Sequence, residues 1–380
     1  MTRVVIAGVS TRAAAGSAAR AGFGVTSLDG YADRDQHPGV RALSLPRDFG
    51  VEFSAAAAAT AAATVEADAS VYLSNFENDP DAVTTLAAGR RLWGNPPDVL
   101  RKCRDPLHVA AMFEAHGLPT PRVAFTNDLN DPNDPNDWLV KPLASGGGHG
   151  IRQWRSGIRT GGGAYLQQRI DGTPGSIVFV AAAGRVVVLG VSRQLIGDDR
   201  FGVGDYRYCG SILAPATDAH FDAGEPVAES ARALANVAAA DLELVGVNGI
   251  DFVARDGVAY PVEINPRWSA SVELVERASG RSVFAAHAAA CDRSELSFAH
   301  DPRRPFRAFG KAIVFARGTS VIGDTEGWLR DPDVRDVPHH GETIPAGHPI
   351  CTVFAEAADA AACEAALVAS AARIYAELDR

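Results

Sequence analysis

The chain has 380 residues, enough for two or three domains with a sizeable core. Apolar residues make up 47% and charged residues 22% of it, which is ordinary for a globular protein, and its apolar segments are too short to cross a bilayer. The formal net charge of −10 gives no basic surface of the kind that binds nucleic acid. We therefore expect neither a nucleic-acid nor a membrane partner.

The first hundred residues alternate between strands and helices. We expect strands at 4–9, 25–29 and 71–74, and helices at 12–21 and 52–64. This alternation predicts an α/β fold with a doubly wound, mostly parallel sheet. Glu77 follows the third strand, where α/β proteins tend to bind ligands, so it is a candidate substrate contact. An acid near a helix start gives the same pattern for a purely structural reason.

The rest of the chain reads as helices, hairpins and short strands. Proline at its start and glycine after its end predict a helix over 106–117, and 126–138 is a turn-rich loop inside a small lid at 120–165. Further on we expect a hairpin built from 176–180 and 186–194, a helix at 226–240, a tight turn at 341–349 and a closing helix at 358–378.

The cysteines favour a cytoplasmic location. There are five, and no two form a CxxC pair. An odd number without such pairs is typical of reduced thiols rather than of a disulfide framework. Residues 3–9 read as a buried strand and not as a signal peptide. We expect a cytoplasmic protein, and a homodimer is left open.

Residues 249–267 predict a β-hairpin. Val, Ile, Phe and Tyr alternate along both arms, and Arg255-Asp256-Gly257 reads as a three-residue turn that ends in glycine. Pairing centred on Asp256 places Asp251 opposite Pro261. Polar side chains at alternate positions then share one face of the hairpin.

That face carries candidate metal ligands. Glu263 lies two residues beyond the partner of Asp251, within diagonal reach, and Asn265 follows two residues later. Two carboxylates and an amide oxygen suit Mg²⁺ (or Mn²⁺), which also takes phosphate oxygens. An exposed acidic hairpin without a metal is the alternative.

A second segment combines a lysine with a glycine loop. Lys141 lies in a short apolar strand that leads into Ser145-Gly146-Gly147-Gly148-His149-Gly150. Backbone N–H groups of such a loop approach phosphate oxygens, although a flexible turn has the same composition. Only three of the 36 basic residues are lysines, namely Lys102, Lys141 and Lys311. We infer that the lysines that remain need a compact ammonium group.

Together these segments resemble an ATP-grasp ligase along about residues 100–290. The resemblance implies that ATP phosphates are held by Lys141, Ser145, Gly146, Gly147 and Gly148. It implies that the adenine pocket is lined by Gln167, Gln168, Arg169 and Ile170. It further implies that Asp251, Glu263 and Asn265 bind the metal and that Arg267 steadies the transferred phosphoryl group.

The whole chain further resembles predicted ATP-dependent carboligases related to biotin carboxylase. The matching stretches are Thr11–Gly22, Tyr206–Ser211 and Ile344–Val353. That branch is similar to ligases associated with one-carbon coenzymes of the methanofuran and tetrahydromethanopterin type. The parts expected from it are a doubly wound domain at 1–104, an α+β ATP-grasp domain at 105–304 that carries the lid, and a β-rich unit with a closing helix at 305–380.

One position departs from the family pattern. Many ATP-grasp proteins carry Asp-Lys eleven residues before a Gly-Leu-Pro turn, and that lysine reaches the α-phosphate. Here the turn is at 117–119, and position 106 is proline. Arg101, Lys102 or Arg104 from the preceding turn is the expected substitute, and Lys102 is our choice. A solvated helix end is the alternative.

The resemblance implies carboxylate–amine ligation. A carboxylate attacks the γ-phosphoryl group of ATP, ADP leaves, and an amine traps the acyl phosphate. Glutamate is the best guess for one substrate. A carboxylase that acts through carboxyphosphate remains an alternative, and so does a non-catalytic ATP-binding regulatory protein, which the missing lysine favours.

A few other polar residues have two interpretations. Arg193 follows a predicted strand and is expected to hold a substrate carboxylate or phosphate, the alternative being an ion pair. Ser269 and Ser271 suit a substrate pocket or the cap of a helix. His149 is a phosphate contact or a spacer. His339-His340 point to opposite sides of an extended chain, so we do not expect them to bind a metal together.

Overall fold

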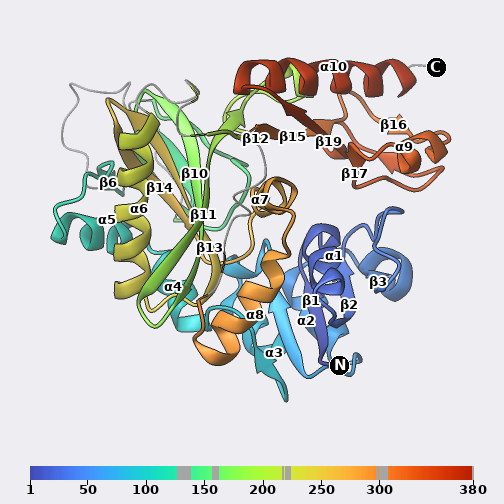
Figure 1. Cartoon of the computed structure of the whole chain (residues 1–380), viewed down its shortest axis with the longest axis horizontal. Helices are drawn as coiled ribbons and strands as arrows, with labels where there is room; N and C mark the ends of the chain where they lie inside the picture. Colours follow the sequence, from blue (N-terminus) through green and yellow to red (C-terminus); the bar gives the residue numbers. More distant parts are fainter. Residues whose placement is uncertain are drawn as a thin grey trace.

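The computed structural model describes residues 1–125, 138–155, 162–215, 218, 224–296, 298 and 307–378 (Figure 1). The predicted loop at 126–138 lies outside the described residues except for Trp138. Within the described ranges, none of the helices has the length and apolar character needed to cross a membrane.

The N-terminal part is the predicted parallel sheet, with the strand order β3-β2-β1-β4-β5. Val4 and Ile6 pack toward α1, whereas Val5 and Ala7 pack toward α2, so helices cover both faces. Its elements are β1 (Arg3–Ala7), α1 (Arg12–Arg20), β2 (Gly24–Asp29), β3 (Val40–Ser44), η1 (Leu45–Phe49), α2 (Ala55–Ala62), β4 (Ala69–Tyr72), η2 (Phe76–Asn78), α3 (Pro80–Leu86) and β5 (Arg91–Leu92).

Two helices and a small sheet follow. The small sheet has the strand order β6-β9-β7-β8, and the glycine loop connects β7 to β8. This part comprises α4 (Pro97–Cys103), α5 (Pro106–Ala115), β6 (Val123–Ala124), β7 (Trp138–Pro142), β8 (Arg152–Gln153) and β9 (Ala164–Gln168). Pro106 starts α5, and Gly117 after it has φ 69°, as the proline and glycine positions predicted.

The main sheet has eight antiparallel strands in the order β14-β13-β10-β11-β12-β15-β19-β17. They are β10 (Thr173–Ala182), β11 (Arg185–Ile196), β12 (Tyr208–Leu213), β13 (Gly246–Arg255), β14 (Val258–Asn265), β15 (Ala308–Phe315), β17 (Val334–Arg335) and β19 (Pro349–Ala357). Because β15 pairs with β12, one sheet continues across the division that we predicted at residue 304. The three-domain division stays a prediction.

Helices cover this sheet at both ends (Figure 1). Helix α6 packs on β10, β11 and β14, and α10 packs on β15 and β19. The remaining elements are η3 (Asp199–Phe201), α6 (Gly224–Asp241), α7 (Val272–Ser279), α8 (Val283–Arg293), β16 (Ser320–Val321), α9 (Glu326–Arg330), β18 (Thr343–Ile344) and α10 (Ala360–Leu378).

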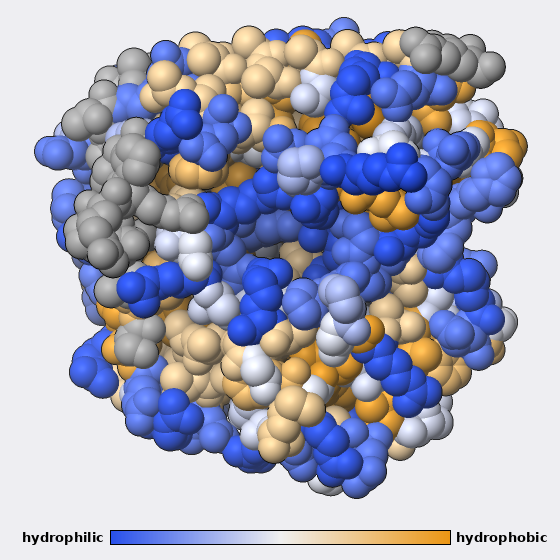
Figure 2. Space-filling model, turned by 45° about the vertical axis from the view of Figure 1, so that its right-hand side comes forward, coloured by the Kyte–Doolittle hydropathy of each residue, from blue (hydrophilic) through white to orange (hydrophobic). Residues whose placement is uncertain are grey.

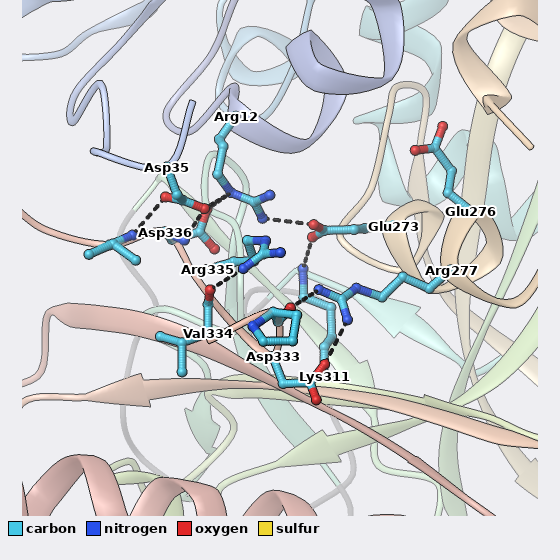
Figure 3. A network of polar contacts seen from close by, with 12 residues as sticks. Arg12, Asp35, Glu273, Glu276, Arg277, Lys311, Asp333, Val334, Arg335 and Asp336 are labelled. Carbon is cyan, nitrogen blue, oxygen red and sulfur yellow. Dashed lines mark hydrogen bonds and ion pairs between the residues drawn. The ribbon is translucent and has the colours of Figure 1, made fainter. Parts of the chain in front are cut away.

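A buried charge network joins the N-terminal sheet to the rest of the molecule (Figure 3). Arg12 of α1 is 8% exposed and donates to Asp336 Oδ1 at 2.6 Å and to Glu273 Oε1 at 2.8 Å. Asp35 Oδ2 lies 3.4 Å from Arg12 Nε, and Lys311 Nζ donates to Glu273 Oε2 at 3.0 Å. Burial alone would raise the pKa of Glu273, but the two cations hold it well below its ordinary value.

Candidate active site

The acidic hairpin forms as β13 and β14, with a tighter turn than predicted. Only Asp256 and Gly257 lie between the paired residues Arg255 and Val258, and their φ angles are 51° and 79°. Two consecutive positive φ angles indicate a type I′ turn, for which Asp-Gly is a preferred sequence. The predicted three-residue turn is therefore wrong.

A β-bulge changes the register before the acids are reached. Phe252 pairs with Pro261, but Asp251 pairs with Glu263, so Val262 is an extra residue on β14. Asp251 thus lies directly opposite Glu263, and the predicted partner Pro261 is wrong. Residues directly opposite each other share a face, so the two carboxylates are closer together than the predicted diagonal arrangement would place them.

The two carboxyl groups have different surroundings. Asp251 accepts hydrogen bonds from Gln194 Nε2 at 2.9 Å and from Asn265 Nδ2 at 3.0 Å. Burial, followed by the charge of Glu263, raises the pKa of Asp251 to about 6. Burial acts on Glu263 in the same direction, but Arg104 and then Lys141 hold its pKa below the ordinary value.

Arg267 follows the hairpin and is almost buried, with 10% of its side chain exposed. Its Nη2 donates to Asn265 Oδ1 at 3.0 Å, which ties it to the acidic pair through Asn265. Its Nε and Nη2 also donate to Glu77 of the N-terminal part. Burial alone would lower the pKa of Arg267, but the charges of Glu77 and then Glu263 and Asp251 raise it.

Lys141 lies on β7 and points toward the same hairpin. It is 7% exposed, and its Nζ donates to the carbonyl of Val262 at 2.9 Å and to Gln167 Oε1 at 3.1 Å. The bulge residue therefore presents its carbonyl to the lysine. No carboxylate among the described residues lies within ion-pair distance of Lys141, so its charge is available for an anionic ligand.

The glycine loop rests on the segment before β12. Gly147 accepts a hydrogen bond from the backbone N–H of Tyr208 at 3.1 Å. Gly148 has φ 78°, and a Cβ built there would lie 1.8 Å from the carbonyl oxygen of Tyr206. Glycine is therefore required at position 148 by both conformation and space, which explains part of the loop composition.

Arg104, not Lys102, reaches the site from the end of α4. Its Nη1 donates to Glu263 Oε1 at 2.5 Å, and its Nη2 donates at 3.0 Å to the carbonyls of both Leu143 and Ser145. Our choice of Lys102 is not supported, because that side chain is exposed on the turn of the helix that faces solvent. The third candidate, Arg101, forms an exposed ion pair instead.

Several of these groups line one cavity that opens to solvent, whereas Asp251, Asn265 and Arg267 lie outside its lining. Its lining includes Gly148 of the glycine loop and the polar or charged residues Arg104, Thr120, Lys141, Ser145, Tyr165, Gln167 and Glu263. Apolar walls come from Val109, Ala110, Ile151 and Val262. Figure 2 shows a hydrophilic hollow on the face of the molecule turned toward the viewer.

Three predicted adenine contacts lie outside this cavity lining. Gln167 faces the cavity, whereas Gln168 is the next residue on β9 and its Oε1 instead accepts from the backbone of Arg122. Arg169 is exposed and pairs with Asp171 at 2.9 Å, and Ile170 is half-buried outside the lining. Tyr165, two residues before Gln167, lines the cavity as part of the predicted segment.

Other candidates have structural contacts. Arg193 forms an ion pair with Glu364 of α10, so the structure favours the ion-pair interpretation over a substrate contact. Ser271 stands at the start of α7 without a capping side-chain bond and lies 3.4 Å from Ser211 Oγ. Ser269 Oγ is buried and has no hydrogen-bond partner among the described residues. His339 contacts the carbonyl of Ala32 at 2.9 Å.

The donor set suits a magnesium ion bound together with phosphates. The described residues contain no group of three or more His, Cys, Asp and Glu side chains arranged to hold a metal by themselves. Mg²⁺ commonly takes one or two carboxylates and completes its shell with water and phosphate oxygens. The directly opposed Asp251 and Glu263 match that pattern, and a bound cation would offset both the burial and the charge of Glu263 that raise the pKa of Asp251.

Residues 103–271 match the sequence model of the ATP-grasp domain family. The L-amino acid ligase of Bacillus licheniformis has a similar structure, with a TM-score of 0.70 at 19% identity over 97% of this chain and 96% of that one. The chain has the ATP-grasp fold.

Other solved structures are similar to about the same extent. Biotin carboxylase from Campylobacter jejuni has a TM-score of 0.69 at 14% identity, covering 96% of this chain and 89% of that one. N5-carboxyaminoimidazole ribonucleotide synthetase from Thermotoga maritima has a TM-score of 0.68 at 17% identity, covering 100% and 98%. An uncharacterised protein of Methanocaldococcus jannaschii is 30% identical over 114 residues, but this match spans only 27% of that protein.

Proposed function

We propose that this protein is an ADP-forming carboxylate–amine ligase that acts through an acyl phosphate. The observation that carries the proposal is the direct opposition of Asp251 and Glu263 beside Arg267, together with a cavity that Glu263 lines with Lys141 and with Ser145 and Gly148 of the glycine loop. Similar folds in an amino acid ligase and in two carboxylating enzymes support ATP-dependent activation of a carboxyl or carbonate group.

The charges of the site match the first half of that reaction. A substrate carboxylate oxygen attacks the γ-phosphorus of ATP, the bond to the β,γ-bridging oxygen breaks, and ADP leaves. Lys141 and Arg104 would hold the phosphates from the side of α4 and β7, and the N–H groups of the glycine loop would cover them. Mg²⁺ (or Mn²⁺) held by Asp251 and Glu263, with Asn265 beside them, would neutralise phosphate charge.

Arg267 offsets the negative charge that gathers where two anions meet. Its guanidinium lies next to Asn265 and the acidic pair, so it can face both the incoming carboxylate and the transferred phosphoryl group. In the second half, an amine nitrogen attacks the acyl carbon, phosphate leaves, and the nitrogen loses a proton. Ser269 follows Arg267 by two residues and its hydroxyl has no partner within the described ranges, so it is a candidate to orient the second substrate.

The substrate proposal rests on resemblance rather than on geometry. We propose that glutamate is one substrate and that the product belongs to coenzyme biosynthesis, because the chain resembles carboligases of the one-carbon coenzyme branch. Arg267 is the carboxylate anchor in this proposal, since Arg193 is paired with Glu364. A cytoplasmic location and an assembly as a homodimer are part of the same proposal.

Two other functions are tested in the same experiment. We would measure ADP release with a panel of amino acids, each with and without an amine acceptor, and separately with bicarbonate. Dependence on an amino acid and an amine supports ligation, and dependence on bicarbonate supports the carboxylase. Absence of turnover with every addition, together with ATP binding, supports a regulatory ATP-binding protein. Glu263→Gln is the matched control, because it removes a metal ligand and keeps the shape of the side chain.

A further inference from the structure

Glu77 holds the guanidinium of Arg267 from a distant part of the chain. It lies in η2, just after β4 of the N-terminal sheet, and is 2% exposed. Its Oε1 accepts from Arg267 Nε at 2.8 Å and from Arg267 Nη2 at 2.7 Å. Both donors use the same oxygen, and the other oxygen, Oε2, is buried with no hydrogen-bond partner among the described residues.

This contact determines which edge of Arg267 is left for a ligand. The edge formed by Nε and Nη2 is occupied by Glu77 and by Asn265 Oδ1. Nη1 donates to the carbonyl of Trp268 at 3.2 Å and keeps one further N–H. The guanidinium is planar and rigid, so fixing one edge also fixes the direction of the remaining donor.

The backbone next to Arg267 is held from the same sheet. The carbonyl of Pro266 lies 2.9 Å from Asn95 Nδ2 and 3.1 Å from the Tyr72 hydroxyl. The turn that presents Glu77 includes Asn75, which has φ 85° although it is not glycine. Asparagine tolerates this left-handed conformation better than most other residues do.

The neighbour of Glu77 contacts the other half of the site. Asn78 Nδ2 donates to the carbonyl of Ser145 in the glycine loop at 3.4 Å. Arg104 contacts the same carbonyl from α4. The turn at 75–78 therefore meets both the arginine and the phosphate-covering loop.

We propose that Glu77 is a positioning residue for phosphoryl transfer, acting through Arg267. The proposal rests on the proposed function of the site. Besides Glu77, the acids whose charges act on the buried guanidinium are Glu263 and Asp251. Without the charge of Glu77, Arg267 would be drawn onto the metal-binding carboxylates and away from the transferred group. In this proposal the N-terminal part contributes a positioning residue to the active site, although it lies outside the residues that match the ATP-grasp sequence model.

The test compares Glu77→Gln with Asp81→Asn. Both changes convert an acid of the N-terminal part to its amide, but Asp81 is 88% exposed, and among the described residues its ion pair is with Arg101. We expect Glu77→Gln to lower kcat by about 10²-fold, the usual effect of losing a preorganised charge contact, with the KM for ATP changed by less than about threefold. Asp81→Asn should match the wild type in both.

A double variant separates positioning from simple support of the fold. If Glu77 acts through Arg267, Glu77→Gln combined with Arg267→Gln has the same kcat as Arg267→Gln alone. Multiplying losses in the double variant would overturn the proposal. If Glu77→Gln does not fold, Glu77→Asp serves in its place, because it keeps the charge and shortens the side chain.

A second measurement does not depend on turnover. In the full chain labelled with ¹⁵N-arginine, hydrogen exchange of the Arg267 Nε–H should be at least about tenfold faster in Glu77→Gln than in the wild type, because a held N–H must open before it exchanges. Equal exchange rates would show that Glu77 does not hold Arg267 in solution and would overturn the proposal. If exchange is slower in the wild type than in Glu77→Gln but the wild type has no ligase activity, Glu77 does hold Arg267 and only the proposed function is rejected.

Discussion

Replacing Asp251 by asparagine should stabilise the ligand-free protein and abolish its activity. The reason is that a carboxylate buried opposite another carboxylate is useful only when a cation lies between them. Glu263 is directly opposite, and burial together with its charge raises the pKa of Asp251 from 3.8 to about 6. The folded state therefore resists ionisation of Asp251 more than the unfolded chain does.

The size and the sign of the effect follow from linkage. A difference of about two pKa units corresponds to about 3 kcal/mol, which is an upper limit for the gain on removing the charge. Above about pH 6 Asp251 is ionised in both states, and the folded protein is destabilised by the full difference of about 3 kcal/mol. Below pH 4 it is protonated in both states, and the cost is absent. Asparagine is uncharged throughout, so its advantage should rise with pH between these limits.

The assay is chemical unfolding of the full chain at pH 5 and pH 7.5, without nucleotide or metal. Asp256→Asn in the exposed turn of the same hairpin is the control, and it should show no such pH-dependent gain. With Mg²⁺ and ATP at pH 7.5 the order should reverse, because only the wild type gains binding energy from the metal. An Asp251→Asn protein that is equally destabilised at both pH values would refute the reasoning.

Three other changes test separate parts of the structure. Lys141→Ala should raise the KM for ATP at least about tenfold. Lys141→Arg should restore little activity, because a planar guanidinium does not replace a compact ammonium group. Activity of the arginine variant equal to that of the wild type would contradict this. Arg104→Met should weaken ATP binding about tenfold or more by calorimetry, while Lys102→Met should not; the opposite ranking would restore Lys102. Arg12→Met should lower the free energy of unfolding by about 3–5 kcal/mol, because it removes this partner from the buried Glu273 and the half-buried Asp336.

The sequence patterns predicted the hairpin of the candidate site but not its exact register. Alternating apolar residues were enough to predict a hairpin whose acids share a face. The bulge at Val262 shifts the register within β14, and alternation of apolar and polar residues does not indicate where an extra residue is inserted. The Asp-Gly dipeptide carried a signal for a two-residue turn, and that signal was missed. Edge strands β3 and β5 were missed because they are short and partly exposed.

Long-range contacts were the least predictable part. Glu77 and Arg267 are 190 residues apart, and nothing in either segment indicates that they pair. Lys102 and Arg104 are two residues apart at the end of α4, so their side chains point to different sides of the helix. Which of them reaches the site depends on how the helix is rotated about its axis. The missing lysine at position 106 nevertheless predicts a substitute cation from that turn, and Arg104 is the cation that reaches the site from there.

The central claim is that a substrate carboxylate becomes an acyl phosphate in this cavity. The direct measurement is a hydroxylamine trap with Mg²⁺, ATP and the amino acid that supports ADP release, followed by mass spectrometry. We predict a hydroxamate of that amino acid, formed by the wild type and absent with Glu263→Gln. ADP release that consumes bicarbonate and gives no hydroxamate would contradict the ligase assignment and replace it with carboxylation.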